Sequence, residues 1–296
     1  MTRLLITGAT GFIGRLCLKA AAGFGELHAV SREARGGDGV VWHRADLREP
    51  AQAAALVRAV KPTHLLHSAW IATPGVYIRS PENLDWLTAT VTLARAFGET
   101  GGQRFVGIGS SAEYAPGNEP CAEDTTPIRP VTIYGQCKVA TWLGVQAAAR
   151  HHGFSAAWGR VFLPYGPGDA VPRLIPVLIA SLRAGKPIET TEGRQRRDFV
   201  FATDAADLLV RMLRGTATGG YNVGSGRGVP VRQAIEMLAD RVGASHDLLR
   251  FGARPLAEGE PMELVADMKK VESDFGWRPA TTLEDGLDWA VANTAG

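Results

Sequence analysis

Tyr134 and Lys138 are the two residues of this sequence that are best placed for acid–base chemistry. They lie four positions apart in the segment Tyr-Gly-Gln-Cys-Lys, so on a helix their side chains share one face. A free tyrosine has a pKa of about 10, and lowering it to about 7 takes roughly 4 kcal/mol. A lysine ammonium about 4 Å away supplies about that much at an effective dielectric of about 20. The pair can therefore exchange a proton with a hydroxyl or a ketone.

A second polar stretch, Ser110-Ser111-Ala112-Glu113-Tyr114, follows residues 104–109, which are predicted to form a strand. Ligands meet an open parallel sheet at the carboxyl ends of its strands. A serine hydroxyl at such an end can hydrogen-bond the substrate oxygen on which Tyr134 acts. Glu113 could act in catalysis or could hold a loop N–H, and the sequence leaves both roles open.

Three glycines at the start of the chain predict a nucleotide-binding turn. Gly8, Gly11 and Gly14 follow the apolar run Leu4-Leu5-Ile6 and precede a helix expected from Arg15 to about Ala22. The first glycine permits a tight turn, the second lets the backbone approach a pyrophosphate, and the third lets helix and strand pack closely. The helix N-terminus adds free N–H groups and the positive end of its dipole.

Strand-like and helix-like segments alternate along the first half of the chain. Strands are predicted at 27–31, 40–43, 63–67, 104–109 and 155–162, and helices at 51–60, 81–99 and 131–152. This alternation predicts an α/β fold with a Rossmann-like, doubly wound parallel sheet. Later segments predict strands at 197–200 and 221–223, a loop at 164–168 and a helix at 173–184. We expect a dinucleotide-binding domain at 1–164 and 199–225 and a smaller C-terminal substrate-binding lobe at 165–198 and 226–296.

The composition is ordinary for a globular protein, and its mild excess of arginine could serve a small anionic ligand. The chain has 296 residues, of which 45% are hydrophobic and 21% charged, and its net charge is +2. This balance favours neither a nucleic-acid partner nor a membrane surface, and no apolar stretch reaches the roughly 18 residues of a membrane span. Cys17, Cys121 and Cys137 show no CxxC spacing, which predicts no disulfide framework and no metal site and fits a reducing cytoplasm. Because the first strand begins at once, we expect no signal peptide.

Together these motifs resemble the extended short-chain dehydrogenase/reductases, in the NAD-dependent epimerase/dehydratase group that acts on nucleotide-activated sugars. The resemblance covers the chain almost from end to end, through TGATGFIG at 7–14, GSSAEY at 109–114, YGQCK at 134–138, YGPG at 165–168, RDFVF at 197–201 and YNVGSG at 221–226. It implies a catalytic triad of Ser111, Tyr134 and Lys138, with Ser111 taken as the serine three positions before Tyr114. It also implies a nucleotide-diphosphate sugar as substrate and a homodimer formed through the helices at 81–99 and 131–152.

The motifs and the resemblance together predict the binding residues. For the cofactor we expect Gly8, Gly11, Phe12, Ile13, Gly14, Ser31, Arg32, Asp46, Leu47, Ala69, Tyr134 and Lys138, and the resemblance implies that Asp46 and Leu47 contact the adenine. For the substrate they are Ser111, Tyr134, Arg173, Arg197 and Arg254. Arg197 is matched to the diphosphate, and the planar fork of an arginine suits phosphate oxygens.

The end of the second predicted strand bears on the choice of cofactor. Binders selective for NAD place an acidic residue there to hold the ribose 2′-hydroxyl, whereas this chain has Ser31 and Arg32. A hydroxyl and a guanidinium suit a 2′-phosphate, so we expect NADP(H) in preference to NAD(H). The alternative is that Arg32 faces solvent and Glu33 reaches the ribose.

Several reactions are compatible with these residues. Arg32 favours an NADPH-dependent reductase acting at C4 of a nucleotide 4-keto-6-deoxy sugar. A 4-epimerase remains open, as does a 4,6-dehydratase, in which Glu113 would take the C5 proton; Ala112 breaks the acidic pair of dTDP-sugar dehydratases. A catalytically silent NADP-binding regulator is the alternative of a different class, and the intact serine, tyrosine and lysine argue against it.

Other notable residues have less specific interpretations. Leu163 stands where many relatives have asparagine, so a polar contact to the substrate is expected to be lost or replaced. Trp70 and Tyr77 follow the fourth predicted strand and either line the sugar pocket or serve packing. His64 and His67 are three positions apart on a strand and face opposite sides, which makes them a poor metal pair.

Overall fold

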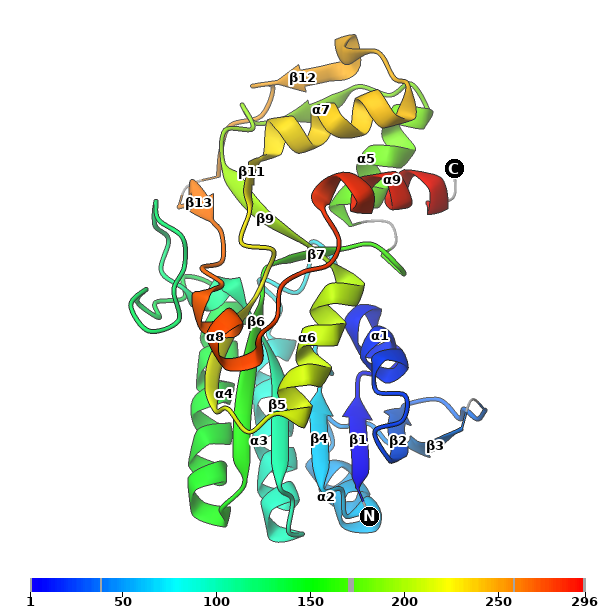
Figure 1. The fold of residues 1–296 in the computed structure, drawn as a ribbon, viewed down its shortest axis with the longest axis vertical. Helices are drawn as coiled ribbons and strands as arrows, with labels where there is room; N and C mark the ends of the chain where they lie inside the picture. Colours follow the sequence, from blue (N-terminus) through cyan, green and yellow to red (C-terminus); the bar gives the residue numbers. More distant parts are fainter. Residues whose placement is uncertain (1, 38, 170–172, 258, 295–296) are drawn as a thin grey trace.

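The structure is a computed structural model that describes residues 2–37, 39–169, 173–257 and 259–294. Its centre is a seven-stranded sheet in which every neighbouring pair is parallel, in the order β10-β6-β5-β4-β1-β2-β3 (Figure 1). The strands are β1 (Arg3–Thr7), β2 (Glu26–Ser31), β3 (Val40–Arg44), β4 (His64–His67), β5 (Arg104–Ser110), β6 (Ser155–Val161) and β10 (Gly219–Val223). This architecture confirms the predicted Rossmann-like parallel sheet.

Helices cover both faces of this sheet. One face carries α1 (Phe12–Ala20) and α6 (Ala202–Arg214), and the other carries α2 (Pro50–Val60), α3 (Glu82–Glu99) and α4 (Ile133–His152). In β1, Leu4 and Ile6 pack toward the first layer and Leu5 toward the second, and all three are fully buried. Burial on both faces explains why the strands are almost continuously apolar.

The C-terminal part of the chain builds a smaller lobe, drawn above the sheet in Figure 1. One small sheet contains β7 (Leu163–Tyr165), β9 (Arg196–Phe201), β11 (Gly228–Pro230) and β13 (Glu263–Leu264), and a second pairs β8 (Ile188–Thr190) with β12 (Leu249–Phe251). The helices α5 (Leu174–Arg183), α7 (Val231–Val242) and α9 (Leu283–Asn293) share an apolar core with β9, and α8 (Lys269–Phe275) lies near β10.

The lobe differs from the sequence prediction at two strands. Residues 163–165, of which 164 and 165 were expected in a loop, form β7 because Leu163 and Tyr165 pair with Phe199 and Phe201 of β9. That partner lies far along the chain, so the local Pro–Gly pattern does not reveal it. β9 itself, predicted at 197–200, joins this small sheet and not the seven-stranded one. Among the described helices, none is long and apolar enough to cross a membrane.

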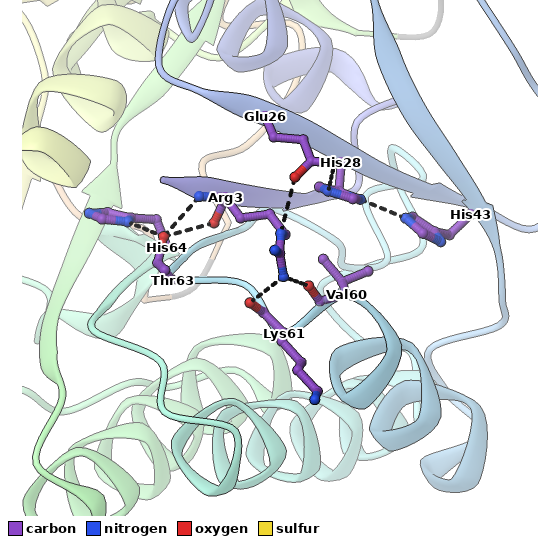
Figure 2. Close-up of polar contacts among 8 residues, drawn as sticks. All are labelled: Arg3, Glu26, His28, His43, Val60, Lys61, Thr63 and His64. Atoms are coloured by element: carbon purple, nitrogen blue, oxygen red, sulfur yellow. Dashed lines mark hydrogen bonds and ion pairs between the residues drawn. The ribbon is translucent and has the colours of Figure 1, made fainter. Parts of the chain in front are cut away.

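Polar side chains join β1, β2, β3 and α2 at the amino edge of the main sheet (Figure 2). Arg3 pairs with Glu26 at 3.1 Å and donates to the carbonyl oxygens of Val60 at 2.5 Å and Lys61 at 3.2 Å. His28 Nδ1 lies 2.8 Å from His43 Nε2. We call this group, with Thr63 and His64, the amino-edge cluster. Arg3 and Thr63 hold the ends of neighbouring elements together, and the contact between His28 and His43 joins β2 and β3 farther along the strands.

Candidate active site

A cavity of about 750 Å³ opens at the carboxyl edge of the main sheet. Its walls come from the glycine turn, the ends of β2 and β5, the segment after β4, the first turn of α4 and the residues around β7 and the start of α5. Parallel strands and helix N-termini converge at this edge, which is the general location of ligand sites in such sheets. The segments that carried the predicted chemistry therefore meet in one place.

The glycine turn is closely packed against the segment after β4. Gly8 has a φ of +65°, and a Cβ on Gly14 would lie 2.1 Å from the Gly8 carbonyl oxygen and 2.5 Å from Ser68 Oγ. Gly11 is the N-cap of α1 and provides no side chain to cap it, so the first N–H groups of the helix are open to the cavity. This cradle fits the pyrophosphate of a dinucleotide.

Tyr134 enters the cavity from the first turn of α4. That helix starts where the Thr132 side chain accepts the Gly135 N–H at 3.1 Å. Ser110, the last residue of β5, also lines the cavity. Burial raises the pKa of Tyr134, while the Ser110 side chain and the Arg173 guanidinium act to lower it.

The structure places Ser110, and not the predicted Ser111, beside Tyr134. Ser111 is buried in the short 3₁₀ turn η1 (Ser111–Glu113) that follows β5. The Ser110 side chain accepts the Ala112 N–H at 3.2 Å, which fixes the start of this turn. Ser110 is the last residue of β5 and lines the cavity, whereas Ser111 begins the buried turn, so the residue at which β5 ends separates the two serines.

Lys138 lies one helical turn beyond Tyr134 and is 3% exposed. Its ammonium donates to the Ile108 carbonyl oxygen at 2.7 Å and lies 3.8 Å from the centroid of the Trp70 ring and 5.8 Å from that of Tyr134. Burial lowers the pKa of Lys138 to about 7, and the Glu113 carboxylate acts against that shift. The expected lowering of the Tyr134 pKa by this lysine is thus not the net result, because burial dominates at both groups.

Glu113 is fully buried behind the cavity and has three partners. Its carboxylate accepts the Ser110 N–H at 2.9 Å and the indole N–H of Trp158 at 2.8 Å, and it pairs with Arg160 at 2.9 Å. These bonds anchor the turn that carries Ser110. Glu113 is not among the residues that line the cavity, so its place in the structure corresponds to the loop-holding alternative.

The cofactor end of the cavity is lined by five of the residues expected there, Ser31, Arg32, Asp46, Leu47 and Ala69, and also by Arg48. Arg48 binds Asp46 through two contacts, at 3.1 and 2.8 Å, and this hydrogen bonding holds the pKa of Asp46 below its usual value. Sequence reasoning missed Arg48, which lies two positions beyond Asp46. Glu33 is exposed, and its backbone N–H donates to Ser31 Oγ at 3.2 Å.

Only one of the three arginines expected at the substrate lies on the described wall of the cavity. Arg173 lines it, 4.8 Å from the Phe12 ring and 3.4 Å from the Asp169 carboxylate. Arg197 instead lies within the lobe, bound to Glu260 at 2.7 Å and to the Pro261 carbonyl oxygen at 2.9 Å. Arg254 is exposed and 3.8 Å from Glu189. Both guanidinium groups bind lobe residues that are distant in the sequence. The residues next to Arg197 and Arg254 along the chain therefore do not indicate these partners.

The comparison with known protein families agrees with this geometry. Residues 4–224 match the sequence profile of the NAD dependent epimerase/dehydratase family, a span that contains the glycine turn, Ser110, Tyr134 and Lys138. The chain belongs to this family. The resemblance to the extended short-chain dehydrogenase/reductases is thereby confirmed, and the protein is an enzyme of that type.

Individual members of the NAD-dependent epimerase/dehydratase family match over nearly their full length. A dTDP-glucose 4,6-dehydratase of Xanthomonas campestris pv. campestris (strain B100) is 26% identical over 99% of this chain and 94% of its own. A UDP-glucose 4-epimerase of Azospirillum brasilense is 28% identical over 96% and 89%. The solved structure of MoeE5 in complex with UDP-glucuronic acid and NAD has a TM-score of 0.84 and 27% identity, covering 99% and 98%.

Proposed function

We propose that this protein is a nucleotide-diphosphate sugar 4-epimerase, which oxidises the C4 hydroxyl of its substrate and reduces the resulting ketone. The observation that carries the proposal is that Ser110, Tyr134 and the uncapped N-terminus of α1 line one cavity. A proton-transfer pair and a pyrophosphate cradle are thus within the span of one dinucleotide. The similarity to a UDP-glucose 4-epimerase supports the substrate class.

Cofactor binding, proton transfer and charge stabilisation fall to different residues of the chain. The N-terminus of α1 binds the pyrophosphate of the dinucleotide. A bound nicotinamide supplies the hydride acceptor and donor. Tyr134 takes the proton of the C4 hydroxyl during oxidation and returns it during reduction, while Ser110 hydrogen-bonds the same oxygen. Lys138 adds a positive charge on the same helix face, which favours the tyrosine anion.

The position of Glu113 argues against a 4,6-dehydratase. That reaction needs a base at C5 of the sugar, in addition to the groups at C4. Both carboxylate oxygens of Glu113 are occupied, one by Ser110 and Trp158 and the other by Arg160. Exchanging these partners for a substrate proton would leave the buried Arg160 guanidinium unpaired, which is costly.

The second candidate is an NADPH-dependent reductase of a nucleotide 4-keto-6-deoxy sugar. It is favoured by Arg32, which lines the cavity at the end of β2. A guanidinium there suits a 2′-phosphate, so this candidate carries a preference for NADP(H). MoeE5 was solved with NAD, which favours the epimerase as the leading proposal.

We also propose a homodimer that forms through α3 and α4 in the cytoplasm. Leu84 of α3 and Leu143 of α4 are 54% and 58% exposed, which is unusual for large apolar side chains on neighbouring helices. Sedimentation of the purified protein tests the dimer.

The cytoplasmic location is supported by the three cysteines, which are free thiols, as is usual in a reducing compartment.

One assay separates these functions. Purified protein is incubated with UDP-, dTDP-, GDP- and CDP-hexoses and the products are resolved by NMR, while NADPH with the matching 4-keto-6-deoxy sugars is followed at 340 nm. Formation of the C4 epimer without net loss of cofactor is the result expected for the epimerase. Consumption of NADPH would establish the reductase instead, and loss of water from the sugar would contradict the structural role of Glu113.

The preference between NADP(H) and NAD(H) can be tested with a variant at Arg32. Exchange of Arg32→Asp places a carboxylate at the end of β2, where it repels a 2′-phosphate and binds a 2′-hydroxyl. If NADP(H) is the natural cofactor, the ratio of affinities should shift toward NAD(H) by about tenfold or more. Titration of both dinucleotides measures the ratio, and an unchanged ratio would remove Arg32 from the cofactor site.

A further inference from the structure

The segment between β4 and α3 places an aromatic ring against each functional side chain of α4. The centroid of the Trp70 ring is 3.8 Å from Lys138 Nζ. The rings of Tyr77 and Tyr134 are 4.8 Å apart at an angle of 85°, an edge-to-face contact. The backbone of this segment also contacts α4, because the Ile78 carbonyl oxygen accepts the Tyr134 N–H at 3.4 Å. Trp70 and Tyr77 also line the cavity, so they serve packing and pocket at once.

Asn83 holds these two aromatic residues together. Its Oδ1 accepts the indole N–H of Trp70 at 2.8 Å, and its Nδ2 donates to the carbonyl oxygens of Tyr77 at 2.7 Å and Ser80 at 2.8 Å. Asn83 is fully buried in the first turn of α3. A buried amide with all of these bonds made fixes the indole plane in one orientation.

Besides Trp70, the described contacts of the Lys138 ammonium are one backbone carbonyl and two more distant rings. It donates to the Ile108 carbonyl oxygen, and the rings of Tyr134 and Trp158 are each 5.8 Å away. Of the titratable groups around it, Glu113 favours the charged form by its negative charge. His67 is kept neutral by burial, with its two ring nitrogens bonded to Thr7 and Thr90. Trp70 is the closest of the aromatic faces.

We propose that Trp70, held by Asn83, is a positioning residue that keeps the Lys138 side chain charged and in place beside Tyr134. The face of an indole attracts a cation more strongly than the faces of the other aromatic side chains, and the attraction is largest where water is excluded. The ring thereby replaces part of the hydration shell that Lys138 loses on burial. The catalytic consequence rests on the proposed function, whereas the effect on Lys138 itself does not.

The first test is the titration of Lys138 in the intact protein. Lysine labelled with ¹³C at Cε is incorporated, and the Lys138 signal is assigned by its loss in Lys138→Met. Removing the aromatic face with Trp70→Leu should lower the midpoint by about one pH unit, which is about tenfold in the protonation equilibrium. Trp70→Phe keeps a ring and should lower it by less. A midpoint that is unchanged or raised in both variants would overturn the proposal, and Trp70→Phe alone decides it if the leucine variant does not fold.

The second test is the pH profile of turnover. If protonated Lys138 is the active form, activity falls as the pH rises through its pKa, and Trp70→Leu should move that fall to lower pH by the same amount as the NMR midpoint. Trp289→Leu, on α9 in the lobe, is the control for loss of a tryptophan and should shift neither curve. An NMR shift without a matching kinetic shift would contradict the link to catalysis. If the wild-type protein turns over no sugar nucleotide, the proposed function fails and the titration still decides the role of Trp70.

Discussion

The two edges of the main sheet use polar side chains in opposite ways. At the amino edge, Arg3 contacts Glu26 and the backbone at the end of α2, and from there contacts run through His28 to His43; none of these residues lines the cavity (Figure 2). At the carboxyl edge, Tyr134 and the ends of the strands face an open volume of about 750 Å³. The comparison teaches that a group of titratable residues indicates a function only where its bonds are not closed on the protein itself.

Helix polarity explains why the edges differ. The last carbonyl groups of a helix lack partners within the helix and attract cations. α2 ends at the amino edge, where Arg3 binds its last carbonyl groups, and Arg104 binds the Met212 and Ala217 carbonyl oxygens near the end of α6. At the carboxyl edge α1 begins without a side-chain cap, so the N–H groups of its first turn remain available to an anion.

The largest effect that should separate the two edges is on catalysis. Tyr134→Phe removes a single hydroxyl from the open site and should lower kcat by about 10³-fold, since it removes the group that transfers the proton. Steady-state kinetics measure kcat, and titration with the dinucleotide should give an affinity close to that of the wild type. Near-normal turnover would show that the carboxyl-edge site has been assigned to the wrong residue.

The next effect concerns stability at the amino edge. Arg104 is 3% exposed and bonds carbonyl oxygens of Met212, Thr216 and Ala217. Arg104→Met leaves these acceptors unsatisfied and should reduce the free energy of unfolding by about 3 kcal/mol. Urea unfolding measures this, with the exposed Arg58→Met as a control. Turnover per folded molecule should not change, and a large loss of turnover would break the distinction between the edges.

Removal of Lys138 should raise the free energy of unfolding, whereas removal of Arg104 should lower it. Because burial holds its pKa at about 7, below the usual 10.5, the unfolded chain binds more protons between these values, and the folded state gains stability as pH rises through that range. Lys138→Met should therefore stabilise the protein by about 2 kcal/mol near pH 6 while abolishing turnover, and this gain should shrink toward pH 10. Urea unfolding across this range tests it, and destabilisation at pH 6 would contradict the argument.

The smallest effect is expected at Arg3. Its side chain is 34% exposed, so solvent screens its pairing with Glu26, and its main contribution is to the carbonyl groups at the end of α2. Arg3→Gln should lower the free energy of unfolding by about 1 kcal/mol or less. A loss as large as that for Arg104→Met would mean that exposure does not rank these two arginines.

The fold could be predicted well from the sequence because its signals are local. Apolar runs such as Leu4–Ile6 and the helix periods between them fix the sheet, and the glycine turn marks its first strand. The small sheet of the lobe could not be predicted in the same way. Leu163 pairs with Phe199 across a long stretch of chain, so its strand is defined by a distant partner and not by its own neighbours.

The site could be predicted in part. Tyr134 and Lys138 share a helix face, which their spacing alone implies. The choice between Ser110 and Ser111 depends on which one ends β5 with its side chain toward the cavity, a difference of one residue that propensity cannot resolve. The structural role of Glu113 depends on its hydrogen bonds with Trp158 and Arg160, which lie on the later strand β6. Burial at this site also governs the pKa of Tyr134, and burial is a property of the assembled layers.

The strand order has a consequence for how the chain acquires its structure during synthesis. β6 ends at Val161, but its outer neighbour β10 begins only at Gly219, after β7, α5, β8, β9 and α6 have been made. Until that segment leaves the ribosome, one edge of β6 has unpaired N–H and carbonyl groups. Exposed edges of this kind recruit other strands. A chain that stalls before residue 219 is therefore expected to aggregate, although it already carries the glycine turn, Ser110, Tyr134 and Lys138.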